Sequence, residues 1–388
     1  MVRIGGSNAQ WMDARILASQ CLPPLPRTRV VLTQAIGHTL AEDLIAQSHL
    51  PPAHTAMMDG YAVSGEPPWT VIGQVHAGQS AAMLDVGQAL RVSTGAHIPP
   101  ATTMVVPQEH AVVEDGIVVG MVAQSERNHI RPPGDEARSG ERVLTAGRRV
   151  TPAVAAIAAS CGYDEIEVYS RPVVNVIVTG DELSDRGPSK PGTIRDSLSM
   201  QLPAWIEWSG GQVGSITRIH DSLGELLRTM DAARGHLLVI TGGSAHGPRD
   251  FGRPALSELG AEFIVDEVDC KPGHPTVLAG LPDGRVVANI PGNPLAACVA
   301  FMTVIDPALT ALAGGSLREL RPAALNEPMT STTTRIVPVT VEHGVATPTG
   351  FARSAMLRGL AAADAFAVVP PTDEPTFECG LLPLPWQS

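Results

Sequence analysis

Short apolar runs broken by proline and glycine fill much of the first half of the chain. Three of them, residues 69–75, 103–107 and 111–119, alternate apolar with polar positions or cluster β-branched side chains. Runs of this length between turn residues predict β-strands, so we expect a small β-rich domain between about residues 50 and 137. Farther along, Thr151 and Pro152 make a favourable N-cap and first helical residue, which predicts a short helix over residues 151–160.

From residue 171 the pattern changes to strands that alternate with helices. Residues 173–178 form a continuous run rich in β-branched side chains, typical of a strand buried in a parallel sheet. Further strands are expected at residues 215–219, 237–240 and 286–290, and helices at residues 197–208, 223–233, 251–259 and 295–312. The alternation predicts right-handed βαβ units in a doubly wound sheet, where ligands bind at the carboxyl ends of the strands. Residues 318–388 return to β-like alternation and predict a small barrel or sandwich.

The charge balance and the cysteines narrow the class of protein. The chain has 27 basic and 39 acidic residues, a formal net charge of −12, which argues against a broad surface for nucleic acid or an anionic membrane. Five cysteines without C-x-x-C spacing favour a reducing compartment and give no zinc signature. Residues 1–11 lack the apolar core of a signal peptide, and the longest apolar stretch, residues 295–305, is too short to span a bilayer. We therefore expect a soluble cytoplasmic protein.

Polar loops accompany the predicted strands of the α/β region. Residues 179–183, 241–250 and 291–294 each follow a strand, and a turn at residues 271–275 lies between the last two. Glycines in these loops can expose backbone N–H groups to a phosphate, helped by the helix that follows. The loops therefore suggest a phosphate site at one edge of the sheet.

Acidic side chains and one lysine lie in the same loops. Asp181, Glu182 and Asp250 offer hard oxygen ligands that suit Mg²⁺, and Lys271 offers a fixed positive charge. Each motif alone is more often a turn or a solvated helix start than a functional loop. Their occurrence in order along the chain favours a site that binds phosphate and metal.

Each motif in the β-rich region can also be explained as an ordinary turn or loop without a function. Asp59 and Gly60 suit a hairpin turn, residues 93–96 and 107–109 suit ordinary loops, and residues 131–136 suit an exposed acidic turn. Composition assigns none of them a role.

As a set, however, these stretches resemble the MoeA/gephyrin family of molybdenumtransferases, over residues from about 30 to 366. The resemblance is most specific in the LPP…MDGYAV motif of the β-rich region. The motifs that carry it, in chain order, are residues 50–52, residues 58–63, residues 94–96 with Pro99, residues 105–109, Ile130 and Arg131 with residues 134–136, residues 179–183, Gly242 and Gly243 with Gly247 and Asp250, residues 271–273 with Pro275, and residues 291–294.

The resemblance implies a multidomain α/β and β architecture. A helix region at residues 1–25 packs on the α/β domain, a linker domain is built from residues 26–50 and 138–170, and a β-rich domain at residues 51–137 is inserted between its two segments. Residues 171–317 form a doubly wound α/β domain resembling the molybdopterin adenylyltransferase fold, and residues 318–388 form a β-barrel-like domain. Family members are homodimers whose active site lies between the α/β and tail domains of one subunit and the inserted domain of the other.

The implied reaction inserts molybdate into adenylylated molybdopterin and releases AMP with the help of Mg²⁺. The residues implied for catalysis are Asp59, Glu136, Asp181, Glu182, Asp250 and Lys271, of which Asp59, Asp181, Glu182 and Asp250 would hold Mg²⁺ or orient the pterin phosphate. The residues implied for binding the pterin nucleotide and molybdate are Thr94, Gly180, Asp196, Ser197, Gly242, Gly243, Gly247, His274, Pro291, Gly292, Asn293, Pro294 and Ser354. The resemblance also implies contact with molybdopterin adenylyltransferase and with molybdoenzyme apoproteins, and neither nucleic acid nor a membrane as a partner.

Several positions depart from the family pattern. His274 replaces the second lysine of KPGKP, so oxyanion affinity is expected to fall or to depend on pH. Side-chain donors are also lost at Leu198, Ala245 and Ala296. The acids of the GED motif are exchanged at residues 135 and 136, and in the tail Arg335 matches a family arginine while residues 352 and 353 replace Gln-Gly beside Ser354. Two alternatives stay open: a divergent paralogue that binds the pterin nucleotide without catalysis, and a molybdopterin adenylyltransferase, against which the inserted domain and the tail argue.

Overall fold

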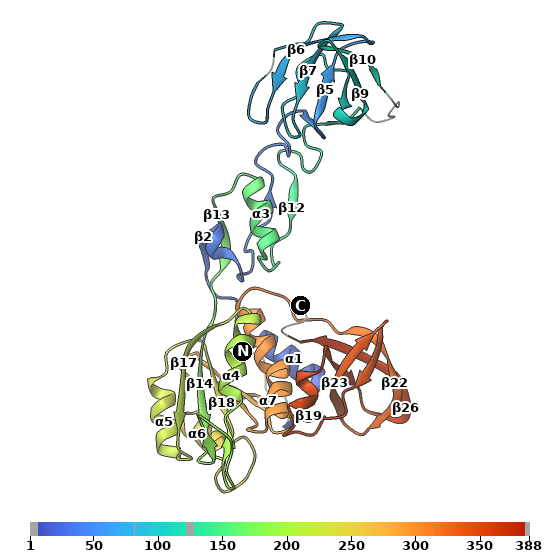
Figure 1. The fold of residues 1–388 in the computed structure, drawn as a ribbon. Coiled ribbons are helices and arrows are strands. Elements are labelled where there is room, and N and C mark those ends of the chain that lie inside the picture. The colour runs from blue at the N-terminus through green and yellow to red at the C-terminus, as the bar shows by residue number, and fades with distance from the viewer. Residues whose placement is uncertain (1–6, 81, 122–127, 385–388) are drawn as a thin grey trace.

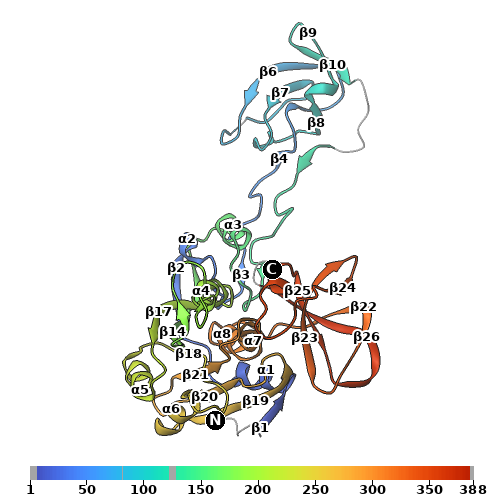
Figure 2. The same ribbon diagram turned by 60° about the horizontal axis from the view of Figure 1, so that its bottom comes forward.

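The computed structural model describes residues 7–80, 82–121 and 128–384 as an elongated molecule (Figure 1). A β-rich domain forms one end, a small linker domain lies in the middle, and an α/β domain with a C-terminal β domain beside it forms the other end. The view turned by 60° shows the same order (Figure 2).

The α/β domain is a sheet covered by helices on both faces, as the doubly wound prediction requires. Its parallel strands lie in the order β17 (Gln212–Ile219), β14 (Val173–Thr179), β18 (Leu237–Thr241) and β21 (Val286–Ile290). One face packs on α4 (Leu198–Trp208) and the other on α5 (Leu223–Ala232) and α6 (Gly252–Glu258). The predicted helices and strands of this region are confirmed, with ends shifted by at most a few residues.

Two strands of this sheet were missed. β19 (Glu262–Lys271) and β20 (Val277–Gly280) extend it beyond β21, and β20 is antiparallel to both of its neighbours. β19 therefore runs in the same direction as β21, and Lys271 is its last residue rather than part of a free turn. The sequence of β19 alternates poorly because acidic residues interrupt its apolar positions, and the pattern gave no clear strand signal.

The N-terminal segment packs on this domain. β1 (Ser7–Gln10) pairs in parallel with β19, and α1 (Trp11–Gln20) buries Trp11, Ala14 and Ala18 in the same core as α4.

The last helix of the α/β domain is longer than its apolar run suggested. α7 (Pro294–Ala300) continues through a π-helical turn (Phe301–Ile305) into α8 (Asp306–Leu312), which gives 19 residues apolar enough by length and composition to cross a membrane. The expectation that this segment is too short to span a bilayer was therefore wrong. Since 89% of its most apolar window is buried inside the protein, it is a core helix of the α/β domain.

The C-terminal domain is a small β-barrel. Its strands are β22 (Arg321–Ser331), β23 (Thr334–Glu342), β24 (Val345–Pro348), β25 (Ala365–Val369) and β26 (Thr372–Pro383), with the short helix α9 (Arg358–Ala361). β23 pairs in parallel with the end of β19, so the barrel continues the edge of the α/β sheet.

The linker domain joins two distant chain segments. β2 (Arg27–Val31) pairs with β13 (Glu165–Tyr169), and β3 (Leu44–Ile45) pairs with β12 (Arg142–Leu144). The helices α2 (Leu32–Ala35) and α3 (Pro152–Ser160) cover them, and the Thr151 side chain caps α3 as predicted.

The β-rich domain holds a sheet of six strands. Their order is β8 (Met104–Pro107), β5 (Gly60–Val63), β7 (Gln88–Val92), β6 (Trp69–Val75), β10 (Ile117–Met121) and β9 (Ala111–Glu114). β4 (Thr55–Ala56) and β11 (Ile130–Arg131) form a separate pair near the linker. The prediction of one strand over residues 111–119 was wrong, because Asp115 and Gly116 both adopt positive φ and turn the chain into a hairpin.

Arginines from three segments converge on the carboxyl end of α4. Arg149 of the linker donates to the carbonyls of Glu207 and Trp208, and Arg171 donates to that of Gly211. Arg318, which precedes the C-terminal domain, stacks on the Trp208 ring at 3.8 Å. Cations at this end of a helix also oppose the partial negative charge of its carbonyls, so they stabilise the junction of the domains.

The junction also contains a buried carboxylate. Asp306 is fully buried, and its Oδ1 accepts from Arg318 Nε at 3.1 Å and from Ser209 Oγ at 2.8 Å. Arg15 lies nearby and donates to the carbonyls of Met302 and Arg318. Burial lowers the pKa of Arg15 to about 10, while the Asp306 carboxylate raises it.

Replacement of Asp306 by alanine should therefore be strongly destabilising. The change leaves the Arg15 and Arg318 guanidinium groups without their compensating charge, which should lower the free energy of unfolding by about 3 kcal/mol or more. Chemical unfolding followed by tryptophan fluorescence measures it, because Trp208 lies at the junction. The matched control is Asp231→Ala, an exposed aspartate in α5, which should change stability by less than about 0.5 kcal/mol; equal effects of both changes would contradict the argument.

Candidate functional site

The carboxyl ends of β14, β18, β21 and β19 lie along one edge of the sheet, and two clefts open there. The first, which we name the acidic cleft, has a volume of about 410 Å³ and lies between the loops after β14, β18 and β21 and the start of α4. Its polar and loop residues include Gly180, Glu182, Arg195, Asp196, Ser197, Asp221, Gly242, Gly243, Arg249, Asp250, Gly292, Asn293 and Pro294. Most of the site residues predicted for the α/β domain are therefore brought together here.

The glycine loop after β18 is held by a residue that sequence reasoning missed. Asn289, fully buried in β21, donates from Nδ2 to the carbonyl of Gly242 at 2.8 Å. Gly242 has a φ of +85°, and a Cβ there would lie 2.8 Å from Thr179 Oγ1, so glycine is required. A Cβ on Gly252 would overlap Asn289 itself. A polar residue inside an otherwise apolar strand was the available signal.

The carboxylates at this edge of the sheet differ in how many hydrogen bonds their oxygens accept. Asp250 Oδ2 accepts from the backbone N–H of Gly247 at 2.6 Å, which fixes the loop. Both oxygens of Asp196 are engaged in the cap of α4, Oδ1 with the backbone N–H groups of Leu198 and Ser199 and Oδ2 with the Ser199 hydroxyl. Glu182 lines the cleft, and its side chain forms no hydrogen bond or ion pair with another described residue, although its backbone carbonyl accepts from the N–H of Ile194 at 2.8 Å.

Asp181 lies at the rim, outside the lining of the acidic cleft. Its Oδ1 accepts from His220 Nδ1 at 3.1 Å and from the backbone N–H of Asp221 at 3.3 Å. These hydrogen bonds, the one from His220 first, hold the pKa of Asp181 below its usual value. Sequence patterns had not pointed to His220 or Asp221.

The second cleft, which we name the basic cleft, lies at the seam between the α/β and C-terminal domains. It has a volume of about 970 Å³ and shares Asn293 with the acidic cleft. Its lining includes Lys271, His274, Pro291, Arg335, Arg353 and Ser354, so the predicted residues Lys271, His274, Pro291 and Ser354 meet here.

The cations of the basic cleft are crowded and unpaired. Lys271 and Arg335 occupy directly paired positions of the parallel strands β19 and β23. Within the described ranges, Lys271, Arg335 and Arg353 form no ion pair with a carboxylate, and Asp269, the acid in the lining, accepts from Gln10 Nε2 at 3.0 Å. Like charges at neighbouring positions of a sheet cost stability, so an anion in this cleft would relieve a strain that the fold carries.

Ser354 reaches this cleft through a fixed backbone. Its carbonyl accepts from the N–H groups of Leu295 and Ala296 at 2.9 and 3.1 Å, which ties the segment before α9 to the first turn of α7. Arg353, the residue before Ser354, also lines the basic cleft.

Three of the predicted site residues lie in a different part of the molecule. Asp59 directly precedes β5 and Thr94 follows β7, both in the β-rich domain, and Glu136 follows β11; none of the three lines either cleft at the sheet edge of the same chain. Asp59 Oδ1 accepts from the backbone N–H of Thr94 at 2.7 Å and from its hydroxyl at 2.9 Å, and these two bonds lower the pKa of Asp59. Glu136 pairs with Arg131 at 3.3 Å.

The hairpin-turn alternative for Asp59 was wrong. Asp59 precedes β5, which pairs with β7 and β8 rather than with β4. Gly60 is required there because a Cβ would overlap the carbonyl of Val106. Asp59 is thus an exposed carboxylate that two donors hold in place.

The four carboxylates expected to bind Mg²⁺ do not converge within one chain. Glu182 and Asp250 line the acidic cleft, Asp181 lies at its rim, and Asp59 is in the β-rich domain. In the part of the chain that the structure describes, no group of three or more His, Cys, Asp or Glu side chains is arranged to hold a metal ion.

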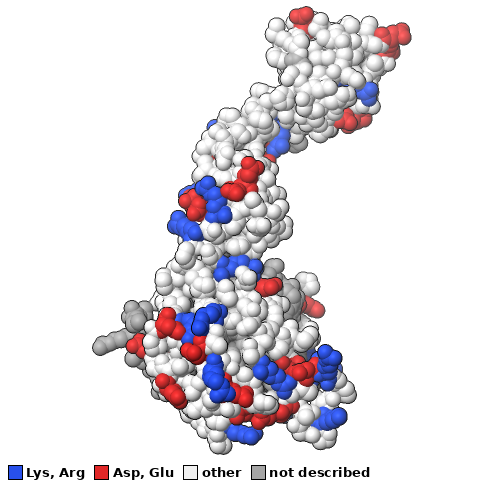
Figure 3. Space-filling model, turned by 90° about the vertical axis from the view of Figure 1, so that its left-hand side faces the viewer, with Lys and Arg blue, Asp and Glu red and all other residues white. Residues whose placement is uncertain are grey.

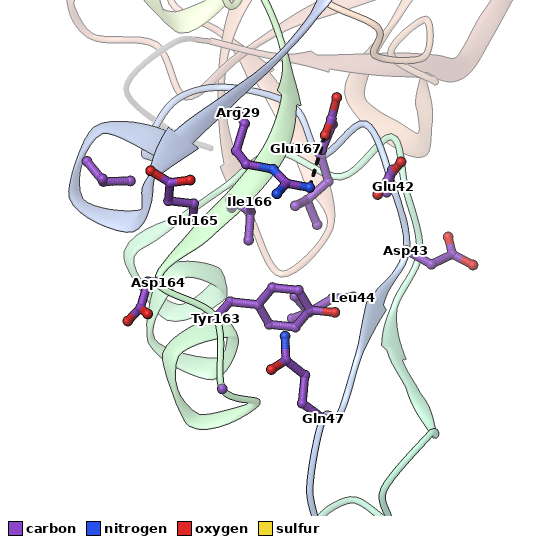
Figure 4. A pocket seen from close by; sticks show the side chains of 13 residues that line it. Arg29, Glu42, Asp43, Leu44, Gln47, Tyr163, Asp164, Glu165, Ile166 and Glu167 are labelled. Carbon is purple, nitrogen blue, oxygen red and sulfur yellow. Dashed lines mark ion pairs between the residues drawn. The ribbon is translucent and has the colours of Figure 1, made fainter.

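A third hollow, of about 590 Å³, lies in the linker domain (Figure 4). Carboxylates dominate its labelled side chains, Arg29 pairs with Glu167 at 3.7 Å, and Asp43 is bonded to Arg142 and to the N–H of Ala146. None of the predicted site residues lines it.

One face of the molecule shows how its surface charges are distributed. On the face of Figure 3, acidic and basic side chains are interspersed and form no continuous basic surface.

The five cysteines are free thiols and form no disulfide.

Models of known protein families match three consecutive parts of the chain. The MoeA N-terminal region (domain I and II) matches residues 10–162, a probable molybdopterin binding domain matches residues 175–311, and the MoeA C-terminal region (domain IV) matches residues 322–379.

Curated relatives and solved structures agree with these matches. The chain is 33% identical over 343 residues to molybdopterin molybdenumtransferase 2 of Mycobacterium tuberculosis, covering 82% of this chain and 83% of that protein. It is 32% identical over 367 residues to the molybdopterin molybdenumtransferase of Bacillus subtilis, covering 88% and 85%. A crystal structure of the MoeA protein of Pyrococcus horikoshii superposes with a TM-score of 0.74 at 26% identity, covering 97% of this chain and 98% of that one.

Identity of this level over most of both chains, together with the three consecutive domain matches and the shared fold, leads to one conclusion: the chain belongs to the MoeA family of molybdopterin molybdenumtransferases.

Proposed function

We propose that the protein inserts molybdate into adenylylated molybdopterin and releases AMP, as a step of molybdenum cofactor biosynthesis. The observation that carries the proposal is the pair of adjoining clefts of opposite charge that share Asn293. A substrate with a nucleotide and phosphates at one end and a metal-accepting dithiolene at the other needs two such neighbouring environments.

The basic cleft suits molybdate, which is the substrate dianion. Lys271 and Arg335 lie side by side without an ion-pair partner among the described residues, and Ser354 offers a hydroxyl in the same cleft. Hydrogen bonds from charged donors to an oxyanion are the stronger kind, so these side chains would bind and orient molybdate next to the pterin.

The acidic cleft suits the phosphates of the pterin nucleotide. The backbone N–H of Gly243 can face a phosphate, whereas that of Gly242 donates to the carbonyl of Ile290 at 2.9 Å. The loop is held by Asn289. The uncommitted side chain of Glu182 and the fixed carboxylate of Asp250 supply hard oxygen ligands on the same wall.

These residues fit Mg²⁺, even though they do not form a three-carboxylate cage. Mg²⁺ is usually held by one or two carboxylates together with substrate phosphates and water. Glu182 and Asp250, with Asp181 at the rim, would hold the ion. Bound there, Mg²⁺ would neutralise the charge that develops as the phosphoanhydride of the substrate breaks.

We further propose a homodimer in which Asp59, Thr94 and Glu136 complete the site of the partner subunit. Two donors hold the Asp59 carboxylate in place, yet the β-rich domain that contains it lies at the opposite end of the molecule from the α/β domain of its own chain (Figure 1). An elongated subunit paired about a twofold axis can bring this end to the α/β domain of its partner.

The same proposal names the proteins that would act immediately before and after this reaction. A molybdopterin adenylyltransferase would deliver the substrate, and molybdoenzyme apoproteins would receive the finished cofactor. Free cysteines throughout the chain are in keeping with the cytoplasm as the site of action.

The first prediction concerns turnover. The purified protein, given adenylylated molybdopterin and Mg²⁺, should release AMP only when molybdate is present. Lys271→Ala should raise the KM for molybdate by about tenfold or more, since it removes a charged donor, and Asp250→Ala should lower kcat by about a hundredfold or more. The AMP formed is quantified by chromatography.

The outcomes separate the competing functions. Asp115→Asn, an exposed turn residue with positive φ, serves as a control and should leave turnover unchanged. Nucleotide binding without AMP release would favour a non-catalytic carrier, and adenylylation of molybdopterin with ATP would favour an adenylyltransferase.

The second prediction concerns the shared site. Asp59→Ala and Asp250→Ala subunits should each be inactive alone, but subunits mixed at random should recover about a quarter of the wild-type activity. Half of the dimers would then be mixed, and one of the two sites in each would hold both aspartates. Size-exclusion chromatography verifies mixing of the subunits, and absence of any recovery in mixed dimers would place Asp59 and Asp250 in the same subunit's site or outside it.

A further inference from the structure

We propose that Arg249 is a specificity-determining residue of the acidic cleft, where its guanidinium group binds the diphosphate bridge of the substrate. The inference rests on the proposed function and deepens it, because it names the side chain that distinguishes an adenylylated pterin from one with a single phosphate. It starts from the charges of the cleft. Among the described residues that line it, Arg195 and Arg249 are the two cations, and they face four carboxylates.

A diphosphate in this cleft needs positive charge from the protein. Each phosphate of the bridge carries one negative charge, and the carboxylates of Glu182 and Asp250 would already balance the charge of a bound Mg²⁺. Arginine N–H groups form strong charge-assisted hydrogen bonds with phosphate oxygens, and the planar guanidinium group can contact two of them at once. One of the two arginines is therefore expected to bind the bridge.

The backbone of Arg249 is fixed by a tight turn. The N–H of Asp250 donates to the carbonyl of Gly247 at 3.0 Å, which closes a turn with Pro248 and Arg249 in its two central positions. The Asp250 carboxylate closes the same turn a second time, since it accepts from the N–H of Gly247 at 2.6 Å. Proline at the first central position restricts the backbone further. The arginine is thus carried by the same loop as the Gly243 N–H and the Asp250 carboxylate.

The side chain of Arg249 is directed by one weak contact. Its Nη2 lies 3.7 Å from Oδ2 of Asp181, whose other oxygen accepts from His220 and from the backbone N–H of Asp221. This separation is too long for a hydrogen bond, and an ion pair with 73% of the arginine side chain exposed is weak. Within the described ranges the Arg249 side chain forms no hydrogen bond and no other ion pair. Its N–H groups therefore remain available to a phosphate.

Arg195 lacks these features, although it lines the same cleft. It lies at the end of the short strand β16 (Ile194–Arg195), and its side chain forms no hydrogen bond or ion pair with another described residue. A long side chain that nothing directs loses more conformational freedom when it binds a ligand than one that a neighbour already directs. We therefore assign the diphosphate to Arg249 and use Arg195 for comparison.

The test uses the full-length protein with ADP as the probe, because ADP carries adenosine and two linked phosphates. The wild type and the variants are titrated calorimetrically in the presence of Mg²⁺. Arg249→Ala should weaken ADP binding by about tenfold or more, since a charged donor to the phosphates is lost. Arg249→Lys should weaken it less, because lysine keeps the charge but not the planar fork.

Two other arginines serve as controls. Arg228 is exposed in α5 and lines neither cleft, so Arg228→Ala should bind ADP as the wild type does. Arg195→Ala should weaken ADP binding less than Arg249→Ala does. All three arginines are exposed, so none of the variants should unfold at a clearly different temperature. An unchanged ADP affinity in Arg249→Ala, or a larger loss in Arg195→Ala, overturns the inference.

The AMP-release assay separates this inference from the proposed function. In Arg249→Ala the KM for adenylylated molybdopterin should rise about tenfold, while the KM for molybdate, which would bind in the basic cleft, should stay the same. Equal rises in both KM values, or wild-type kinetics, overturn the inference and leave the proposed function intact. ADP binding that depends on Arg249 without molybdate-dependent AMP release overturns the proposed function alone. No ADP binding by the wild type overturns the inference together with the assignment of the phosphates to the acidic cleft.

Discussion

The buried carboxylate of Asp306 sets the arrangement of the domains at the lower end of the molecule. It lies inside an apolar core helix, where an uncompensated charge would be very costly, so Arg318 and Ser209 must stay bound to it. Arg318 in turn stacks on Trp208 at the end of α4, and Arg149 of the linker binds the same end. Helix α4 begins at the acidic cleft, where Asp196 caps it, and ends at this junction. The linker therefore contacts one end of α4, and the other end of the same helix forms part of the wall of the acidic cleft.

The direction of one strand decides which charges reach that site. β20 is antiparallel to both neighbours, so β19 ends at the same edge as β21 and delivers Lys271 there. Since β19 also pairs with β23, this second strand of the C-terminal domain places Arg335 beside that lysine. The basic cleft is consequently a product of the seam between two domains, and neither domain would form it alone.

The sequence predicted those parts of the structure that depend on local patterns. The strand at residues 173–178, the capped helix after Thr151 and the glycine loops all carry their signal within a few neighbouring residues. β19 was missed because its acidic positions interrupt the apolar alternation, and those acids are accommodated by Arg253 and the histidines, which come from other segments.

The site residues divide in the same way: those in local sequence motifs were predicted, and those that act through contacts between distant segments were not. Motif order grouped Gly242, Asp250 and Lys271 at one edge, but it could not reveal Asn289, whose role depends on contacts across the sheet. The strand pattern did predict the separate β-rich domain that contains Asp59, but it could not show how that domain lies relative to the sheet (Figure 1).

Keeping Lys271 and Arg335 apart from Glu182 and Asp250 has an energetic reason. Had Lys271 and Arg335 faced Glu182 and Asp250, the four would have paired with one another, and neither a dianion nor a divalent cation would have found free charge. The loop at residues 291–294 lies between the two groups and contributes Asn293 to both linings. The cost is the repulsion of neighbouring cations across β19 and β23, a local loss of stability typical of a site that awaits its ligand.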